Sequence, residues 1–228
     1  MKIASIQMTK GSVSDTIKDR CRITSSTIDK WTWGQKMTTL WYETADADAP
    51  LTQGDFIEQC PLISWKPSST TLNDGDEKTF LQDSVVSYQL DVVVMTQACD
   101  IEHEKFPDMI LCPYVTISTY KSLWKQYKQQ EGESPTDKAW KRIWEELRKG
   151  FTWQHALLGD QDPACPEHII VNFSEIYSAP RSFLESLLRR RKQKRLRLLP
   201  PYREHLSQAF ARFFMRVGLP TPIKADPP

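Results

Sequence analysis

The sequence lacks the long apolar runs of membrane proteins and the short motifs that mark many enzymes. No stretch approaches the roughly 20 consecutive apolar residues that a helix needs to cross a bilayer. The first ten residues hold no apolar segment followed by a cleavage signal, so we expect a cytoplasmic protein with no membrane contact. Motifs for nucleotide binding, phosphate cradling and paired-carboxylate hydrolysis are also missing, which favours a binding protein without a cofactor over an enzyme.

The cysteines are too irregular in number and spacing for a disulfide framework. The five residues are spread along the chain at Cys21, Cys60, Cys99, Cys112 and Cys165. An odd number of widely separated cysteines is typical of buried free thiols in a reducing compartment. We therefore interpret them as free thiols.

Length and composition predict one domain with additions. A chain of 228 residues can form a substantial core without metals or disulfides. Its 39% hydrophobic and 26% charged residues are ordinary for a globular protein. We divide the chain into an N-terminal extension at 1–40, a core at 41–178 with a helical insertion at 118–149, and a basic C-terminal helical segment at 179–228 that packs on the core.

Two strands near the middle of the chain organise the predicted fold. A β-branched run begins at Val85 and leads to the polar residues Gln97 to Asp100, and a second apolar run spans Met109–Val115. Short apolar runs bounded by polar residues are typical of buried strands. The same pattern predicts three further strands at Phe56–Cys60, Phe151–Leu158 and His168–Phe173.

Helical periodicity replaces the strand pattern after Pro113. It predicts a hairpin of two helices, the first over Ser118–Gln129 and the second after the start signal Ser134-Pro135. A further helix is expected after Ser178-Ala179-Pro180, and the amphipathic helix Tyr202–Val217 is expected to dock onto the sheet. The predicted fold class is α+β: a small, strongly bent antiparallel sheet or SH3-like barrel with an inserted helical hairpin and C-terminal helices.

Trp140 and Trp144 in the second helix of the hairpin are the candidate protein-binding residues. Together with Ile143 and Leu147 they repeat at intervals of three and four, which places them on one helical face. An exposed aromatic patch of this kind is typical of an interface. The acidic body of the protein is the other surface that a partner protein could use.

The net charge of +1 hides a concentration of positive charge near the C-terminus. Between Arg181 and Arg216 the sequence holds eleven Lys or Arg residues against two acids. The densest run supplies seven candidate nucleic-acid contacts: Arg189, Arg190, Arg191, Lys192, Lys194, Arg195 and Arg197. Such a run can bind phosphates, but it can equally be a solvated helix end or an arm folded against the acidic body. These three interpretations stay open.

The polar cluster of Gln97, Cys99 and Asp100 follows the central strand abruptly, and we interpret it as structural. A catalytic alternative has Cys99 as a nucleophile, His103 or His155 as its base, and Asp100 or Gln97 as the orienting group. The glycine-flanked turn that displays many nucleophiles is missing here, so we assign no catalytic residue.

Zinc is a second alternative for the same region. Cys99 with His103, Cys165 with His168, and Cys112 nearby offer sulfur and imidazole ligands of the kind that zinc accepts. Their spacings fit no common zinc-finger pattern, so we predict no metal.

The order of the predicted strands resembles the small SH3-like barrels of PemK/MazF-type toxin ribonucleases. The similarity rests on Gly54-Asp55 opening a strand, on Val92–Val94, and on the strand ending at Cys112–Thr116. That family has Arg-Pro before its central strand, where this chain has Gln89–Asp91. The resemblance implies a barrel, with a ribonuclease as an alternative function.

Two further motifs resemble a group of small bacterial proteins that accompany mobile elements and antiviral defence genes. The motifs are Gln-x-Cys-Asp-Ile at Gln97–Ile101 and Arg-Val-Gly-Leu-Pro at Arg216–Pro220. Among known systems the chain looks like the accessory proteins of CRISPR type III-E loci. The resemblance implies a non-catalytic regulatory protein that binds a protein partner encoded at the same locus.

Overall fold

The computed structural model describes residues 40–66, 77–159 and 165–215. Helices and strands in this part of the chain form an α+β fold in which the paired strands are antiparallel. The predicted N-terminal extension, apart from Leu40, and the motif at Arg216–Pro220 lie outside the described residues. None of the described helices has the length and apolar character needed to cross a membrane.

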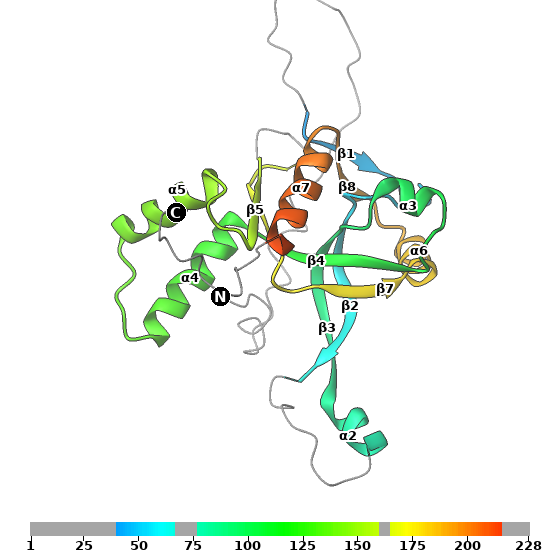
Figure 1. The fold of residues 1–228 in the computed structure, drawn as a ribbon, viewed down its shortest axis with the longest axis horizontal. Helices are drawn as coiled ribbons and strands as arrows, with labels where there is room; N and C mark the ends of the chain where they lie inside the picture. The colour runs from blue at the N-terminus through cyan, green and yellow to red at the C-terminus, as the bar shows by residue number, and fades with distance from the viewer. Residues whose placement is uncertain (1–39, 67–76, 160–164, 216–228) are drawn as a thin grey trace, which may run out of the picture.

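Figure 1 shows the arrangement of the elements, with the α4–α5 hairpin at one side, α7 crossing the sheet and the β2–β3 ribbon extending away from the body. In chain order the elements are β1 (Tyr42–Ala45), β2 (Phe56–Trp65), α2 (Glu77–Ser84), β3 (Val85–Val94), α3 (Ala98–Glu102), β4 (Asp108–Thr116), α4 (Ile117–Gln130), α5 (Asp137–Arg148), β5 (His155–Leu158), β6 (Ile169–Asn172), β7 (Tyr177–Pro180), α6 (Arg181–Arg191), β8 (Arg195–Leu198) and α7 (Tyr202–Phe214).

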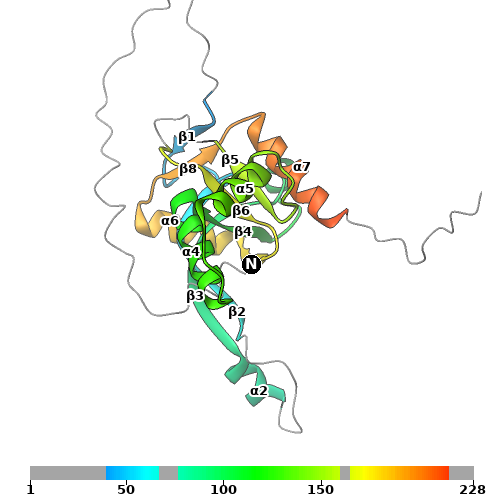
Figure 2. The same cartoon turned by 90° about the vertical axis from the view of Figure 1, so that its left-hand side faces the viewer.

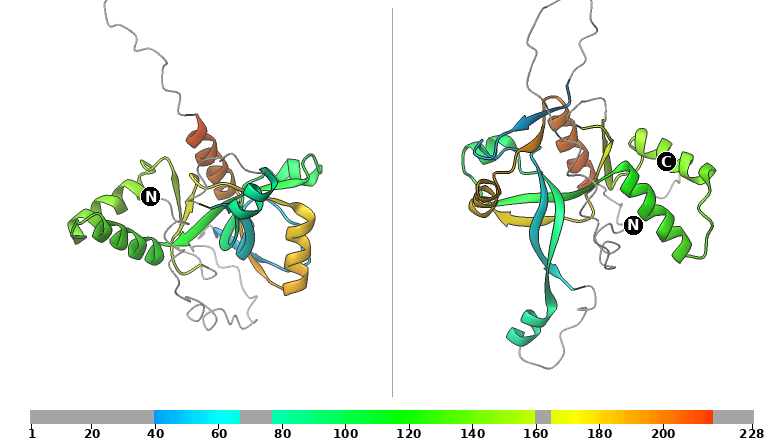
Figure 3. Two further views of the ribbon diagram at one scale, coloured as in Figure 1. Left: turned by 90° about the horizontal axis from the view of Figure 1, so that it is seen from below. Right: turned by 180° about the vertical axis from the view of Figure 1, so that it is seen from behind.

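β4 is the central strand of the main sheet, in which the strands are ordered β2-β3-β4-β6-β5. One edge of β4 pairs with β3, and the other pairs first with β7 and then with β6. β1 and β8 form a two-stranded sheet that is joined to the main sheet where Leu198 N donates to Gly54 O at 2.9 Å. The views in Figure 3 show the resulting open, bent sheet. Since β2 and β5 do not pair with each other within the described residues, the SH3-like barrel is not confirmed.

Strand β3 ends in the apolar run Val92–Val94 because this end of the strand is covered on both faces. Val93 packs in a core that contains Leu206 of α7. Its neighbours Val92 and Val94 belong to a second core that contains Leu184 of α6. Successive side chains of a strand point to opposite faces, so a strand buried on both sides has no polar positions.

The predicted helical hairpin is present as α4 and α5, and it lies between β4 and β5 in the chain. Leu123 of α4 and Leu147 of α5 pack with Ile170 of β6 in a third core. Figure 2 shows the two helices next to each other in front of the sheet. The hairpin is therefore held by buried apolar contacts with the sheet.

Three predictions of strand ends were wrong. β2 continues through Pro61 to Trp65, and its register shift lies earlier, between Ile57 and Cys60. β5 begins at His155 rather than at Phe151. β3 ends at Val94, so the polar cluster lies in the short helix α3 and the residue before it, not at the end of a strand.

The short strands β1, β7 and β8 were not predicted. Ser178-Ala179-Pro180 belong to β7, and the helix expected after them is present as α6, which begins at Arg181. Residues 195–198 form β8 rather than part of a helix or a free arm. Each of these strands has four residues, as β5 and β6 do, but none holds the continuous apolar run that allowed β5 and β6 to be predicted.

Candidate functional site

The predicted binding residues Trp140 and Trp144 line one surface hollow, which we call the tryptophan hollow. Its volume is about 310 Å³. The hollow lies where the start of α4, α5 and the segment before β6 meet, and its lining consists of Ile117, Ser118, Lys121, Trp140, Trp144 and His168. The structure therefore brings the two tryptophans together at an open surface.

The position of the tryptophans follows from how α5 begins and packs. Thr136 caps the helix, since its side-chain oxygen accepts a hydrogen bond from Ala139 N at 3.2 Å. Trp140 then packs against Trp124 of α4, with 5.4 Å between the ring centroids. One turn later Trp144 contacts the ring of His168 at 5.2 Å. Both tryptophans remain half-buried rather than enclosed.

Most polar groups of the tryptophan hollow already interact with neighbouring side chains or with the backbone. Lys121 Nζ lies 5.3 Å from the centre of the Trp140 ring, which is a cation–π arrangement. Ser118 Oγ donates to a carboxylate oxygen of Glu167 at 2.8 Å. His168 Nδ1 lies 3.1 Å from the carbonyl oxygen of Leu158. These interactions hold the walls of the hollow in place, and its open surface is mainly aromatic.

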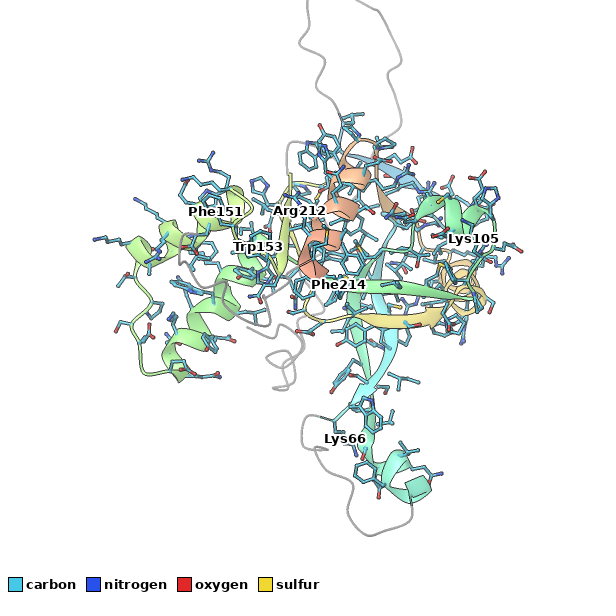
Figure 4. All side chains as sticks on the ribbon, viewed as in Figure 1. Lys66, Lys105, Phe151, Trp153, Arg212 and Phe214 are labelled. Carbon is cyan, nitrogen blue, oxygen red and sulfur yellow. The ribbon has the colours of Figure 1, made fainter. Side chains whose placement is uncertain are left out.

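The polar cluster predicted from the sequence lies around the start of α3. Cys99 Sγ lies 3.8 Å from Gln97 Oε1 and 3.8 Å from Asp100 Oδ1. Lys105 Nζ donates to Asp100 Oδ1 at 2.7 Å, and this hydrogen bond lowers the pKa of the Asp100 carboxyl. In Figure 4 Lys105 lies at the outer end of this region. The cluster is thus a local surface network.

A second hollow lies beside this cluster, and we call it the α7 groove. Its volume is about 480 Å³. Gln97 and Asp100 contribute to its lining, whereas Cys99 does not. The full lining consists of Met95, Thr96, Gln97, Asp100, Phe106, Pro107, Asp108, Ile110, Ser178, Ser207, Phe210 and Ala211. This groove was not predicted from the sequence, because its walls come from β4, β7 and α7 as well as from the cluster.

The residues proposed for zinc binding do not gather. Cys112 is buried in β4, and Cys165 Sγ donates to Glu167 O at 3.2 Å. Cys99 is exposed on α3. Within residues 40–66, 77–159 and 165–215, no group of three or more His, Cys, Asp or Glu side chains is placed to hold a metal ion.

Of the two histidines considered as a base for Cys99, His103 directly follows α3 and is exposed, whereas His155 lies elsewhere in the fold. His155 is buried on β5, and its ring contacts Tyr120 of α4 at 5.4 Å between centroids. Burial lowers the pKa of His155 to about 4. Neither ring nitrogen has a hydrogen-bond partner among the residues that the structure describes. His155 is therefore an uncharged core residue.

The basic run is divided by the fold into two parts with different roles. Arg189, Arg190 and Arg191 form the last turn of α6, where positive charge is favourable beside the carbonyl end of a helix. Lys192 follows in a left-handed conformation. Lys194 forms an exposed ion pair with Asp46 at 3.0 Å. Arg189 and Arg190 therefore correspond to the solvated helix end that was one of the three interpretations, whereas the Arg191 guanidinium donates to Glu58 O and Gln59 O of β2, each at 2.9 Å.

The second part of the run is folded inward. Arg195 Nε donates to Asp55 Oδ2 at 2.7 Å, and both side chains are completely buried. Arg197 Nε donates to the other oxygen of the same carboxylate at 2.5 Å. A buried guanidinium cannot reach a phosphate, so the nucleic-acid prediction was wrong for Arg195. The hydrogen bonds of Arg197 to Asp55 also raise the pKa of the Arg197 guanidinium, and this side chain is only 18% exposed.

Comparisons of the chain with protein-family models, with curated proteins and with solved structures find no match.

Proposed function

We propose that this protein is a non-catalytic adaptor that binds another protein through the tryptophan hollow. The observation that carries the proposal is the pairing of Trp140 and Trp144 at one open hollow on the helical hairpin. Tryptophan is enriched among the residues that dominate binding energy in interfaces. The half-buried rings present a large apolar area. Because the packing already restricts the orientation of these side chains, little conformational entropy is lost on binding.

Nearby aromatic side chains extend the apolar surface of the hairpin. Phe151 and Trp153, which directly follow α5, are 66% and 54% exposed. Figure 4 shows both at the junction of the hairpin with the sheet. Clustered exposed aromatic residues are typical of protein interfaces, whereas single exposed apolar residues are not informative.

The charge of the hairpin indicates the chemistry of the partner. Residues 117–149 hold eight Lys or Arg against five Asp or Glu. A complementary surface would insert an apolar side chain between the tryptophans and place carboxylates opposite the lysines. The resemblance to defence-associated accessory proteins suggests that such a partner is encoded at the same locus, in a CRISPR-associated or related antiviral system.

The test is pairwise binding to the products of the neighbouring genes, measured by co-purification and titration calorimetry. Trp144→Ala should weaken the interaction roughly thirtyfold, because it removes one of the two tryptophan rings that line the hollow. Trp65→Ala is the matched control, since Trp65 is 56% exposed on the distant β2–β3 ribbon and should not matter. If none of these gene products binds, or if both variants behave as the unchanged protein, the proposal is wrong.

Nucleic-acid binding remains a second candidate, for a specific reason. Arg189, Arg190 and Lys192 are exposed at the end of α6 and have no ion-pair partner among the described residues. Three phosphate contacts would give a salt dependence of log K with a slope of about −2 for single strands. Fluorescence anisotropy with labelled RNA at several salt concentrations, repeated with Arg189→Glu and Arg190→Glu together, tests this candidate.

A further inference from the structure

The α7 groove has walls that are fixed by hydrogen bonds before any ligand arrives. Gln53 is buried, and its Nε2 donates to Met95 O at 3.1 Å and to Ser207 Oγ at 3.2 Å. This side chain therefore ties the end of β3 to α7. Small-molecule sites are usually largely pre-formed in this way.

The floor of the groove is fixed as well. Met95 N donates to Ile110 O at 2.8 Å, and Ile110 N donates to Thr96 Oγ1 at 2.7 Å. The residues that follow β3 are thus attached to β4 by two hydrogen bonds. These bonds hold Ile110 in place while its side chain stays 41% exposed toward solvent.

The shape and apolar lining of the groove suit a small organic molecule. Its volume of about 480 Å³ falls within the range of roughly 300–1,000 Å³ that is usual for ligand pockets. Phe106, Ile110 and Phe210 supply aromatic and aliphatic walls, with Met95 behind them. The walls come from β4, β7, α7 and the segment around α3, so a ligand can be contacted on several sides.

The charged groups of the lining all have one sign. Asp100 and Asp108 line the groove, and none of the Lys or Arg residues that the structure describes does. Asp100 is already paired with Lys105. Asp108 has no ion-pair partner in the described part of the chain.

Arg181 of α6 lies next to this region, but its side chain pairs with residues other than Asp108. Arg181 N donates to Pro107 O, but its side chain pairs with Glu185 at 2.7 Å and with Glu104 at 3.4 Å. The groove therefore combines apolar walls with one uncompensated carboxylate. An apolar pocket with a few charged groups selects ligands by the sign of their charge.

We propose that the α7 groove binds a small organic cation, an ammonium or guanidinium compound with an apolar body. The cationic group would pair with Asp108, with the hydroxyls of Ser178 and Ser207 as further acceptors. The apolar body would lie against Phe106 and Phe210. This site is separate from the tryptophan hollow and does not depend on the adaptor function.

The experiment uses three probes of similar shape and different charge: phenethylammonium, 2-phenylethanol and 3-phenylpropionate. Binding to the full chain is followed by the shifts of backbone amides in ¹H–¹⁵N spectra. Phenethylammonium should bind most tightly and 3-phenylpropionate least, with the largest shifts at Ile110 and Ser207. The affinity for phenethylammonium should also fall as salt is added, whereas that of the alcohol should not.

Two variants test separately how the charge of the groove and the shape of the groove contribute to binding. Asp108→Asn should weaken phenethylammonium binding about fivefold and leave 2-phenylethanol unchanged, as expected for a single exposed charge pair. Ala211→Trp should fill the groove and abolish binding of all three probes. Trp144→Ala in the tryptophan hollow is the control and should change nothing.

Three results would overturn the proposal. Equal affinities for the three probes would show that charge is not recognised. Shifts confined to residues outside the groove would place the site elsewhere. A peptide with blocked ends and an internal Phe-Lys pair that binds more tightly than phenethylammonium would show that the groove takes a protein segment instead of a small cation.

Discussion

Arg195 and Asp55 lie 140 positions apart in the chain, and their side chains form an ion pair that is completely removed from solvent. Arg195 also donates to the carbonyl oxygens of Asp46, Ala49 and Pro50 at 2.7–2.9 Å. Its guanidinium therefore satisfies backbone groups of the segment before β2 while it neutralises Asp55. Because every partner is satisfied, β8 is attached to the β1–β2 connection by a complete polar network.

Replacing Arg195 with methionine should destabilise the protein by about 3–5 kcal/mol. The change leaves the buried Asp55 carboxylate with Arg197 as its one remaining cationic partner, and it removes the Arg195 donors to the carbonyl oxygens of Asp46 and Ala49. Lys194→Met is the control, because Lys194 forms an exposed pair with Asp46 and should contribute about 1 kcal/mol or less. Urea unfolding followed by tryptophan fluorescence measures both, and similar losses in the two variants would contradict the prediction.

Gly54 should tolerate alanine much less well than Gly150 does. Both residues have a positive φ, +83° and +68°, so each alanine variant carries backbone strain. A Cβ at Gly54 would also lie 3.0 Å from Leu198 Cβ, whereas one at Gly150 would meet no atom within 4 Å. We expect losses of about 2–4 kcal/mol for Gly54→Ala and about 1 kcal/mol for Gly150→Ala. Thermal unfolding of the two variants provides the measurement, and equal losses would show that the contact with Leu198 is unimportant.

The buried His155 should make the protein less stable as the pH falls. Its pKa is about 4 in the folded state, below the ordinary value of 6.5, because burial disfavours the charged imidazolium. Between these two values the unfolded chain binds more protons than the folded one. The free energy of unfolding is therefore unaffected by this residue above pH 6.5. It falls as the pH drops from 6.5 toward 4, by about 3 kcal/mol in total.

The variant His155→Phe should lose this part of the pH dependence. It should also be as stable as the unchanged protein at pH 7 or more stable, since it removes two buried nitrogens without hydrogen-bond partners among the described residues. His103→Gln is the control, because His103 is exposed. The free energy of unfolding is measured from pH 4 to pH 8, and an unchanged slope in His155→Phe would contradict the expectation.

Cys99 should be alkylated in the folded protein, whereas Cys60 and Cys112 should not. Cys99 is exposed on α3. Burial raises the pKa of Cys60 to about 11 and that of Cys112 to about 12, so their thiolate fractions at pH 7.5 are very small. Peptide mapping after treatment with N-ethylmaleimide, with and without urea, shows which thiols react. Modification of all three at one rate in the absence of urea would contradict the burial of the two strand cysteines.

The periodic apolar segments were predictable from the sequence because their signals are local. The run ending at Val94, the run at Met109–Val115 and the repeat through Trp140 and Leu147 each carry their period within about ten residues. These segments form β3, β4 and α5. Their burial in three apolar cores follows from the same residues that predicted them.

The role of charged and very short segments depended on distant partners. Nothing near Arg195 in the sequence distinguishes it from Arg190, yet one is enclosed with Asp55 and the other faces solvent. β8 is recognisable only by its pairing with β1, and the α7 groove exists only where α7 crosses β4 beside α3. Apolar periodicity is a local property of the sequence. Ion pairing, strand pairing and cavity shape depend on contacts between distant segments that only folding brings together.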